Sequence, residues 1–322
     1  MAISRRALLP LSLVLAQSCN KQGRKQIAVI PKATSHLFFV TIHKGVDQAA
    51  KEFAVDVLWN GPNEETDHGR QIQIVDAMVV QHVDAIAISA TDERALAASV
   101  QRAINAGIPV TIFDSGVNVD NYVSFIATGN FEAGCTAARR LAALIQSKGN
   151  GKGKVGMVAH KPGGSSTVLR EQGFEQTMAK EFPSIIIAAK QFGMADRAKA
   201  RAIAENILTA NPDIDGLFAS SEASSLGAIQ AIRSRNLAGK VKLITFDTSD
   251  SHVEALREGL IDLMLVQDTV RIGYEAVKSL ADKLAGKTPL KRLDLPVKEI
   301  DKNGMDAPEI RKLLFPQGEA GQ

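Results

Sequence analysis

The stretch GIPVTIFDSG, residues 107–116, is the most informative indication of the fold. Its run of β-branched residues predicts a strand, and the apolar pattern stops at one carboxylate, Asp114. Much later, the stretch KVKLITFDTSD, residues 240–250, repeats this arrangement and ends its apolar run at Asp247. Two strands that each deliver one aspartate predict two similar halves whose aspartates face a shared cleft.

Strand-like and helix-like patterns alternate along both halves of the chain. The predicted strands are apolar almost throughout, which is typical of parallel sheets covered by helices on both faces. We therefore expect an α/β fold with two lobes, each with a parallel sheet, and we interpret the polar segment 116–130 as a crossover between them. The predicted strands span residues 26–31, 55–59, 83–89 and 108–113 in the first half and 155–159, 184–188, 217–219, 241–246 and 260–268 in the second.

Composition limits the class of protein. A chain of 322 residues is long for a single core and favours two domains. The net charge of +3 is small and gives no support for a nucleic-acid partner, which would need a concentrated basic face. No stretch reaches the roughly 18 apolar residues of a membrane-spanning helix.

The first residues have the pattern of an export signal. Arg5 and Arg6 precede the apolar run 7–16, and small residues follow as far as Cys19. We interpret residues 1–19 as a signal peptide, with a frayed N-terminal helix as the alternative. Cys19 is similar to the lipid-attachment cysteine of bacterial lipoproteins, although Ala16 stands where that pattern usually has leucine. A lipid-anchored and a soluble mature form both stay open.

Polar residues follow several of the predicted strands, where open parallel sheets bind ligands. Carboxylates there can accept from the hydroxyls of a ligand, while lysine, arginine and amide groups donate to it. Phe38 and Phe39 offer a flat apolar face to a sugar ring. The strand-end candidates are Lys32, Ser35, His36, Thr91, Asp114, Ser115, the loop KPGGSS, Ser221, Glu222, Asp247 and Gln267.

Each candidate also has a purely structural interpretation. Asp114 and Asp247 are each compatible with a helix N-cap, a common role of aspartate. The two phenylalanines suit a core, an arginine at position 170 suits a solvated helix face, and Gln267 simply ends a strand. The occurrence of both aspartates at matching points of two similar halves favours the cleft.

Enzyme motifs give little. We expect no GxGxxG dinucleotide fingerprint, no phosphate loop, no zinc-binding HExxH and no GxSxG nucleophile, and therefore no enzyme, no cofactor and no metal. The loop Gly163–Ser166 can bind an anion through its backbone and is the one feature that favours a phosphorylated ligand.

Six stretches taken in order resemble the periplasmic sugar-binding proteins of bacterial ABC importers, of the ribose-binding type among type I periplasmic binding proteins. They are IAVIPKATSHLFFVTIHKGVDQAAKE, GIPVTIFDSG, LREQGFEQ, LFASSEASSLGAIQAI, KLITFDTSD and LIDLMLVQD, within residues 26–314. The resemblance implies two Rossmann-like lobes that enclose the sugar and are joined by three crossings, near Thr128, Asp268 and Val297. The implied lobes comprise 26–128 plus 269–297 and 129–268 plus 298–314, followed by a flexible tail, 315–322.

The resemblance also implies ligand contacts. Polar contacts fall on Lys32 and His36, the ring-sandwiching aromatics on Phe38 and Phe39, and the remaining contacts on Asp114, Arg170, Asp247 and Gln267. Three positions depart from ribose-type members: Ser115 replaces an arginine, Ala195 an aromatic residue and Ser221 an asparagine. These smaller side chains imply a ligand other than ribose in a roomier pocket.

We therefore expect an exported, non-enzymatic binding protein. It would capture a monosaccharide or similar polyhydroxylated molecule and deliver it to an ABC-type membrane permease, in the periplasm or lipid-anchored on the outer side of the cytoplasmic membrane. Three alternatives remain: a sensor that feeds a chemotaxis or signalling receptor, a repressor-type effector domain, and a cytosolic enzyme on a doubly wound fold. A repressor would need a helix-turn-helix before the first strand, where only the export-like leader stands.

Overall fold

The computed structural model describes residues 23–147 and 151–315. The predicted signal peptide, Cys19 and nearly all of the predicted tail lie outside the described residues. The elements of the first half are β1 (Gln26–Ile30), α1 (Leu37–Glu52), β2 (Asp56–Trp59), α2 (His68–Val80), β3 (Ala85–Ile88), α3 (Ala97–Asn105), β4 (Val110–Phe113) and β5 (Phe125–Thr128).

The second half repeats the alternation of strands and helices and then returns to the first. Its elements are α4 (Asn130–Gln146), β6 (Gly153–Ala159), α5 (Ser165–Glu181), β7 (Ile185–Phe192), α6 (Arg197–Ala210), β8 (Gly216–Ala219), α7 (Glu222–Ser234), β9 (Lys242–Phe246), α8 (Asp250–Arg257) and β10 (Leu263–Val266). The chain ends with α9 (Thr269–Leu284), β11 (Arg292–Leu295), β12 (Lys298–Ile300) and α10 (Pro308–Leu314).

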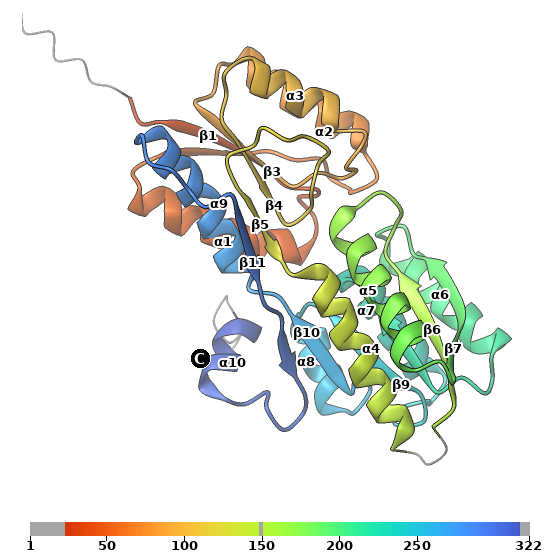
Figure 1. Ribbon diagram of the computed structural model, residues 1–322. Coiled ribbons are helices and arrows are strands. Elements are labelled where there is room, and N and C mark those ends of the chain that lie inside the picture. The colour runs from red at the N-terminus through yellow and green to blue at the C-terminus, as the bar shows by residue number, and fades with distance from the viewer. Residues whose placement is uncertain (1–22, 148–150, 316–322) are drawn as a thin grey trace, which may run out of the picture.

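The strands form two six-stranded sheets, in the orders β11-β5-β4-β3-β1-β2 and β12-β10-β9-β8-β6-β7. Neighbouring strands are parallel except β12, which runs antiparallel to β10. The α/β fold with two mostly parallel sheets is thus confirmed, with this one antiparallel edge. We call the first sheet with α1, α2, α3 and α9 the first lobe, and the second sheet with its helices the second lobe (Figure 1).

The chain passes between the lobes three times, from β5 to α4, from β10 to α9 and from β11 to β12. In Figure 1 the blue segments α9 and β11 accordingly lie with the red-to-yellow first half. The crossover predicted at 116–130 is only partly right, because it contains strand β5. With only four residues between polar neighbours, β5 has too weak an apolar run to be recognised in the sequence.

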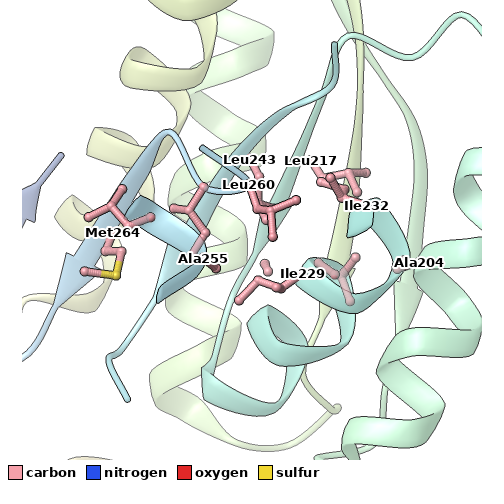
Figure 2. Close-up of a cluster of buried hydrophobic side chains, with 14 of the residues drawn as sticks. Ala204, Leu217, Ile229, Ile232, Leu243, Ala255, Leu260 and Met264 are labelled. Carbon is pink, nitrogen blue, oxygen red and sulfur yellow. The ribbon is translucent and has the colours of Figure 1, made fainter. Parts of the chain in front are cut away.

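Apolar side chains fill the space between sheet and helices on both faces of each sheet. Figure 2 shows one of these clusters, in which Leu217 and Leu243 of the second sheet meet Ile229 and Ile232 of α7. Each such fully buried side chain contributes about 1.5–3 kcal/mol relative to leaving it in water. The two sheets are therefore rigid supports for the loops at their edges.

Close helix pairs fix the geometry of each lobe. A Cβ atom on Gly45 of α1 would lie 1.8 Å from the carbonyl oxygen of Val270, at the start of α9. In the second lobe, a Cβ on Gly134 of α4 would lie 2.0 Å from the carbonyl oxygen of Arg170 in α5. Both contacts are too short for any side chain, so glycine is required, and the second one places the backbone of Arg170.

Candidate functional site

A cavity lies between the two lobes, at the carboxyl ends of the parallel strands. About 330 Å³ of space at this place is not filled by protein atoms, including space open to solvent. The first lobe contributes five residues to the cavity wall: Lys32, His36, Phe38, Glu65 and Asp114. The second lobe contributes His160, Ser166, Thr167, Arg170, Ser221, Glu222, Ala223, Asp247 and Gln267.

The two strand-end aspartates both line this cavity and share an unusual backbone conformation. Asp114 follows β4 with φ of 56°, and Asp247 follows β9 with φ of 69°. This left-handed region is uncommon for residues other than glycine, and aspartate tolerates it better than most. Neither residue is a helix N-cap, since Ser249 caps α8 and no helix follows Asp114 before α4. The structural interpretation of both aspartates as caps is therefore wrong.

Asp114 is held by a cation and a hydroxyl. Its Oδ2 lies 3.1 Å from Lys32 Nζ and accepts a hydrogen bond of 2.8 Å from Ser89 Oγ. Burial by itself would lower the pKa of Lys32, but the charges of Asp114 and Glu65 outweigh it and raise that pKa. The lysine therefore stays a cation inside the cleft.

Asp247 is held by neutral donors. Gln267 Nε2 donates to its Oδ1 at 2.6 Å, and the backbone N–H of Glu222 donates to its Oδ2 at 2.9 Å. Thr128 Oγ1 donates to Gln267 Oε1 at 2.6 Å and so orients the amide. Burial raises the pKa of Asp247, while the Arg170 charge partly opposes this shift. No cation of the described residues lies within ion-pairing distance of this carboxylate.

Arg170 is the matching cation without a direct counter-ion. Its guanidinium stacks on the Phe246 ring, 4.0 Å from the centroid. It donates to Asn130 Oδ1 at 2.7 Å and to the carbonyl of Ser220 at 3.0 Å. Burial lowers the pKa of Arg170. These neutral partners orient the guanidinium and leave its charge available to the cavity, so the solvated interpretation of this arginine is wrong.

The structure adds Glu65, which no sequence pattern distinguishes from the other polar residues of the loop between β2 and α2. Its Oε1 lies 3.2 Å from His36 Nδ1, and its Oε2 lies 3.0 Å from His160 Nε2 and 3.6 Å from Lys32 Nζ. Burial would raise the pKa of Glu65, but the neighbouring Lys32 and His160 lower it well below its usual range. His160, one residue after β6, could have been found by the strand-end rule.

Glu222, the first residue of α7, also reaches across the cleft. Its Oε2 accepts from the backbone N–H of Phe38 in the first lobe at 3.2 Å, and its Oε1 lies 2.6 Å from Arg197 Nη2. Burial and the neighbouring Asp247 raise the pKa of Glu222. This side chain is thus both part of the wall and a link between the lobes.

Several predicted residues lie outside this wall, among them the strand-end candidates Ser35 and Thr91 and three of the expected ligand contacts. Phe39 packs in the core of the first lobe, edge-on to Phe38 at 5.0 Å between ring centroids. Ser115 is fully buried with its Oγ 3.4 Å from Ser165 Oγ. Ala195 lines a second, neighbouring cavity of about 990 Å³, whose wall also includes His36 and Glu65.

Further contacts hold the lobes against each other. Lys161 Nζ donates to the carbonyl of Thr91 at 2.6 Å, and Ser165 Oγ accepts from the N–H of Gly116 at 2.6 Å. The N–H of Glu93 donates to the carbonyl of Gly163 at 3.1 Å. Ser166 Oγ also accepts from Lys32 Nζ at 3.3 Å. The loop 163–166, predicted as an anion site, thus uses three of its polar atoms to contact the first lobe.

The glycines of GKGKVG, residues 151–156, have the GxGxxG spacing, so the expectation that no such motif occurs was wrong. Gly153 and Gly156 lie within strand β6. A dinucleotide loop instead connects the end of a strand to the start of a helix. Within residues 23–147 and 151–315, no group of three His, Cys, Asp or Glu residues is arranged to hold a metal ion. In the same residues, no helix is both long and apolar enough to cross a membrane.

Comparison with known proteins agrees with this architecture. A family model of the periplasmic binding protein domain matches residues 27–288. The chain is 29% identical to the ribose import binding protein of Bacillus subtilis, over 90% of this chain and 96% of that protein. It is 27% identical to the D-allose-binding periplasmic protein of Escherichia coli, over 83% of this chain and 87% of that protein.

Solved structures are similar over nearly the same length. A carbohydrate transporter solute-binding protein from Agrobacterium radiobacter, in complex with D-arabinose, has a TM-score of 0.88 and 31% identity, and covers 90% of this chain and 99% of its own. An ABC transporter solute-binding protein from Agrobacterium vitis with bound D-fucose has a TM-score of 0.85 and 30% identity, with 90% and 100% covered. Since the family model spans most of the chain and these structures share its fold, the chain belongs to the periplasmic binding protein domain family.

Proposed function

We propose that this protein captures a monosaccharide or a similar polyhydroxylated small molecule between its lobes and delivers it to an ABC-type membrane permease. The observation that carries the proposal is the pairing of Asp247 and Arg170. Both are buried in the cavity wall and oriented by neutral partners, and neither forms an ion pair with another of the described residues. A ligand that both donates and accepts hydrogen bonds suits such a pair.

The wall favours hydroxyl groups. Ligand hydroxyls donate to Asp247 and to Asp114 Oδ1, for which the described residues provide no hydrogen bond, and they accept from Arg170. The Phe38 ring supplies an apolar surface in the same wall. The relatives are named for ribose and allose, and the solved structures hold arabinose and fucose, which supports a sugar here.

Capture works through closure of the lobes. Asp114 belongs to the first lobe, whereas Arg170 and Asp247 belong to the second, so a ligand that contacts all three bridges the cleft. A ligand shifts the equilibrium toward the closed form only by its differential affinity for that form, which these contacts provide. The permease would then recognise the closed form. The sheet composition supports lobes of 26–128 plus 269–297 and 129–268 plus 298–314.

The family is periplasmic and binds solutes without catalysis, so the protein is exported and is not an enzyme. The finer location rests on the sequence alone: the apolar run before Cys19 is compatible both with a soluble periplasmic form and with a lipid anchor on the outer side of the cytoplasmic membrane. Ser221 is smaller than the asparagine of ribose-type relatives and lines the cavity, which supports a ligand other than ribose, whereas Ser115 and Ala195 lie outside the wall and bear less on this choice.

A thermal-shift screen of the mature protein against monosaccharides, polyols and their phosphates tests the proposal. A ligand present at 100 times its Kd stabilises the native state by about 2.7 kcal/mol, which gives a clear rise in Tm. We expect at least one neutral sugar or polyol to give such a rise. If no polyhydroxylated compound stabilises the protein, the proposed function is wrong.

A further inference from the structure

One carboxylate connects basic side chains of both lobes. Glu65 contacts Lys32 and His36 within the first lobe and His160 of the second lobe. Glu65 and His160 are 4% and 3% exposed, so this contact is shielded from solvent. The contact between Glu65 and His160 joins two ionisable side chains of different lobes, and both side chains line the cavity.

The first lobe holds Glu65 in place before closure. Its loop is fastened to the loop after β1, because the N–H of Thr34 donates to the carbonyl of Pro62 at 3.0 Å and Ser35 Oγ donates to the carbonyl of Asn63 at 2.8 Å. Both contacts lie within the first lobe and do not depend on the position of the second. Glu65 therefore reaches into the cleft from a fixed base.

The second lobe holds His160 in the same way. Its Nδ1 lies 2.8 Å from Ser221 Oγ, and its backbone N–H donates to Glu171 Oε1 at 3.1 Å. Glu171 is itself 1% exposed and accepts from Ser220 Oγ at 3.0 Å. Two side chains fixed on separate lobes meet only when the lobes close, and their contact therefore stabilises the closed form alone.

We propose that Glu65 is a positioning residue whose contact with His160 latches the closed cleft and thereby prolongs ligand residence. This inference rests on the proposed function for its kinetic consequence, although the latch itself is a property of the two lobes. Because the ligand meets the open form and leaves after opening, the latch slows dissociation and leaves association almost unchanged.

The test measures lobe closure by single-molecule energy transfer between fluorophores on α3 and α6, first without ligand. We expect Glu65→Gln, which keeps the side-chain volume, to lower the ratio of closed to open molecules about tenfold, the scale of one charge-assisted hydrogen bond. Glu64→Gln is the matched control, since Glu64 is exposed in the same loop. It should leave the ratio as in the wild type.

Stopped-flow binding of D-arabinose, D-allose and D-fucose gives the kinetic readout. For any of them that binds, Glu65→Gln should raise koff about tenfold and change kon less than about twofold. His160→Asn should act alike from the other lobe, and the double variant should be no faster than the faster single variant, because both remove the same contact.

The outcomes separate the latch from the proposed function. A shifted closure ratio together with no sugar binding would overturn the proposed function and support the latch. If Glu65→Gln and His160→Asn match Glu64→Gln in closure and in koff, the latch is refuted. The same holds if they only lower the Tm of the ligand-free protein, which would indicate a purely structural role.

Discussion

The two lobes are built on the same plan, and three of their differences are informative. Starting from β2 and from β7, the strand orders of the two sheets match position by position as far as β5 and β10. The first difference is α8, which connects β9 to β10, whereas β4 reaches β5 through a loop. The second is the edge strand, parallel in β11 and antiparallel in β12.

The third difference concerns the two aspartates. They occupy the same place after matching strands with similar backbone conformations. Asp114 is balanced by the Lys32 cation, whereas Asp247 has only amide donors. The shared strand topology thus determines the position of each carboxylate, and the loops of each lobe determine which groups compensate its charge. This asymmetry lets one end of the cleft stay electrostatically satisfied while the other needs the ligand.

The largest difference we expect is between the stabilities of the Asp114→Ala and Asp247→Ala variants of the ligand-free protein. Asp114→Ala removes the nearest counter-ion of buried Lys32 and should lower the free energy of unfolding by about 3 kcal/mol or more. Asp247→Ala leaves only neutral donors unpaired and should cost about 1–2 kcal/mol. Urea unfolding measures both values, and equal losses would contradict the asymmetry.

The glycine pair should instead behave alike in the two lobes. Gly45→Ala and Gly134→Ala each force a Cβ onto a carbonyl oxygen, at 1.8 and 2.0 Å, and should each cost about 1–3 kcal/mol. Gly69→Ala in α2 is the control, because its nearest atom lies at 3.8 Å, and it should be neutral or slightly stabilising. Loss of stability in only one lobe would show that the helix pairs are not equivalent.

The smallest effect belongs to α8, a helix of the second lobe that connects β9 to β10 and has no counterpart between β4 and β5. Burial lowers the pKa of His252 to about 3 from its ordinary value of 6.5. As pH falls from 6.5 toward 3, His252 becomes protonated in the unfolded chain but stays neutral in the folded protein. The free energy of unfolding therefore decreases with falling pH, by about 1 kcal/mol between pH 6.5 and 5.5. His252→Phe should remove this loss in urea titrations at several pH values, and an unchanged pH profile would contradict it.

Much of the fold could be predicted because the buried strands carry long β-branched runs, as in 108–113 and 241–246. Strands β5 and β11 could not, since four residues between polar neighbours give no periodicity. The strand-end rule predicted Asp114, Asp247 and Gln267 as cleft residues, and all three line the cavity.

Other site residues were beyond local patterns. Glu65 projects from a loop whose path is set by contacts with the loop after β1, and no sequence pattern records that path. Ser115 follows the strand-end aspartate directly, yet its side chain turns to Ser165 and away from the cavity wall. Which side of a sharp turn a residue faces depends on the backbone, and the left-handed conformation of Asp114 decides it here.

One ligand should bridge the strand-end aspartates of both lobes. A crystal structure of the mature protein with the best-stabilising sugar of the screen tests it most directly. We expect ligand hydroxyls within hydrogen-bonding distance of Asp114 and Asp247, with Arg170 donating to the same molecule. A sugar bound elsewhere, or in contact with only one of the two aspartates, would contradict the account.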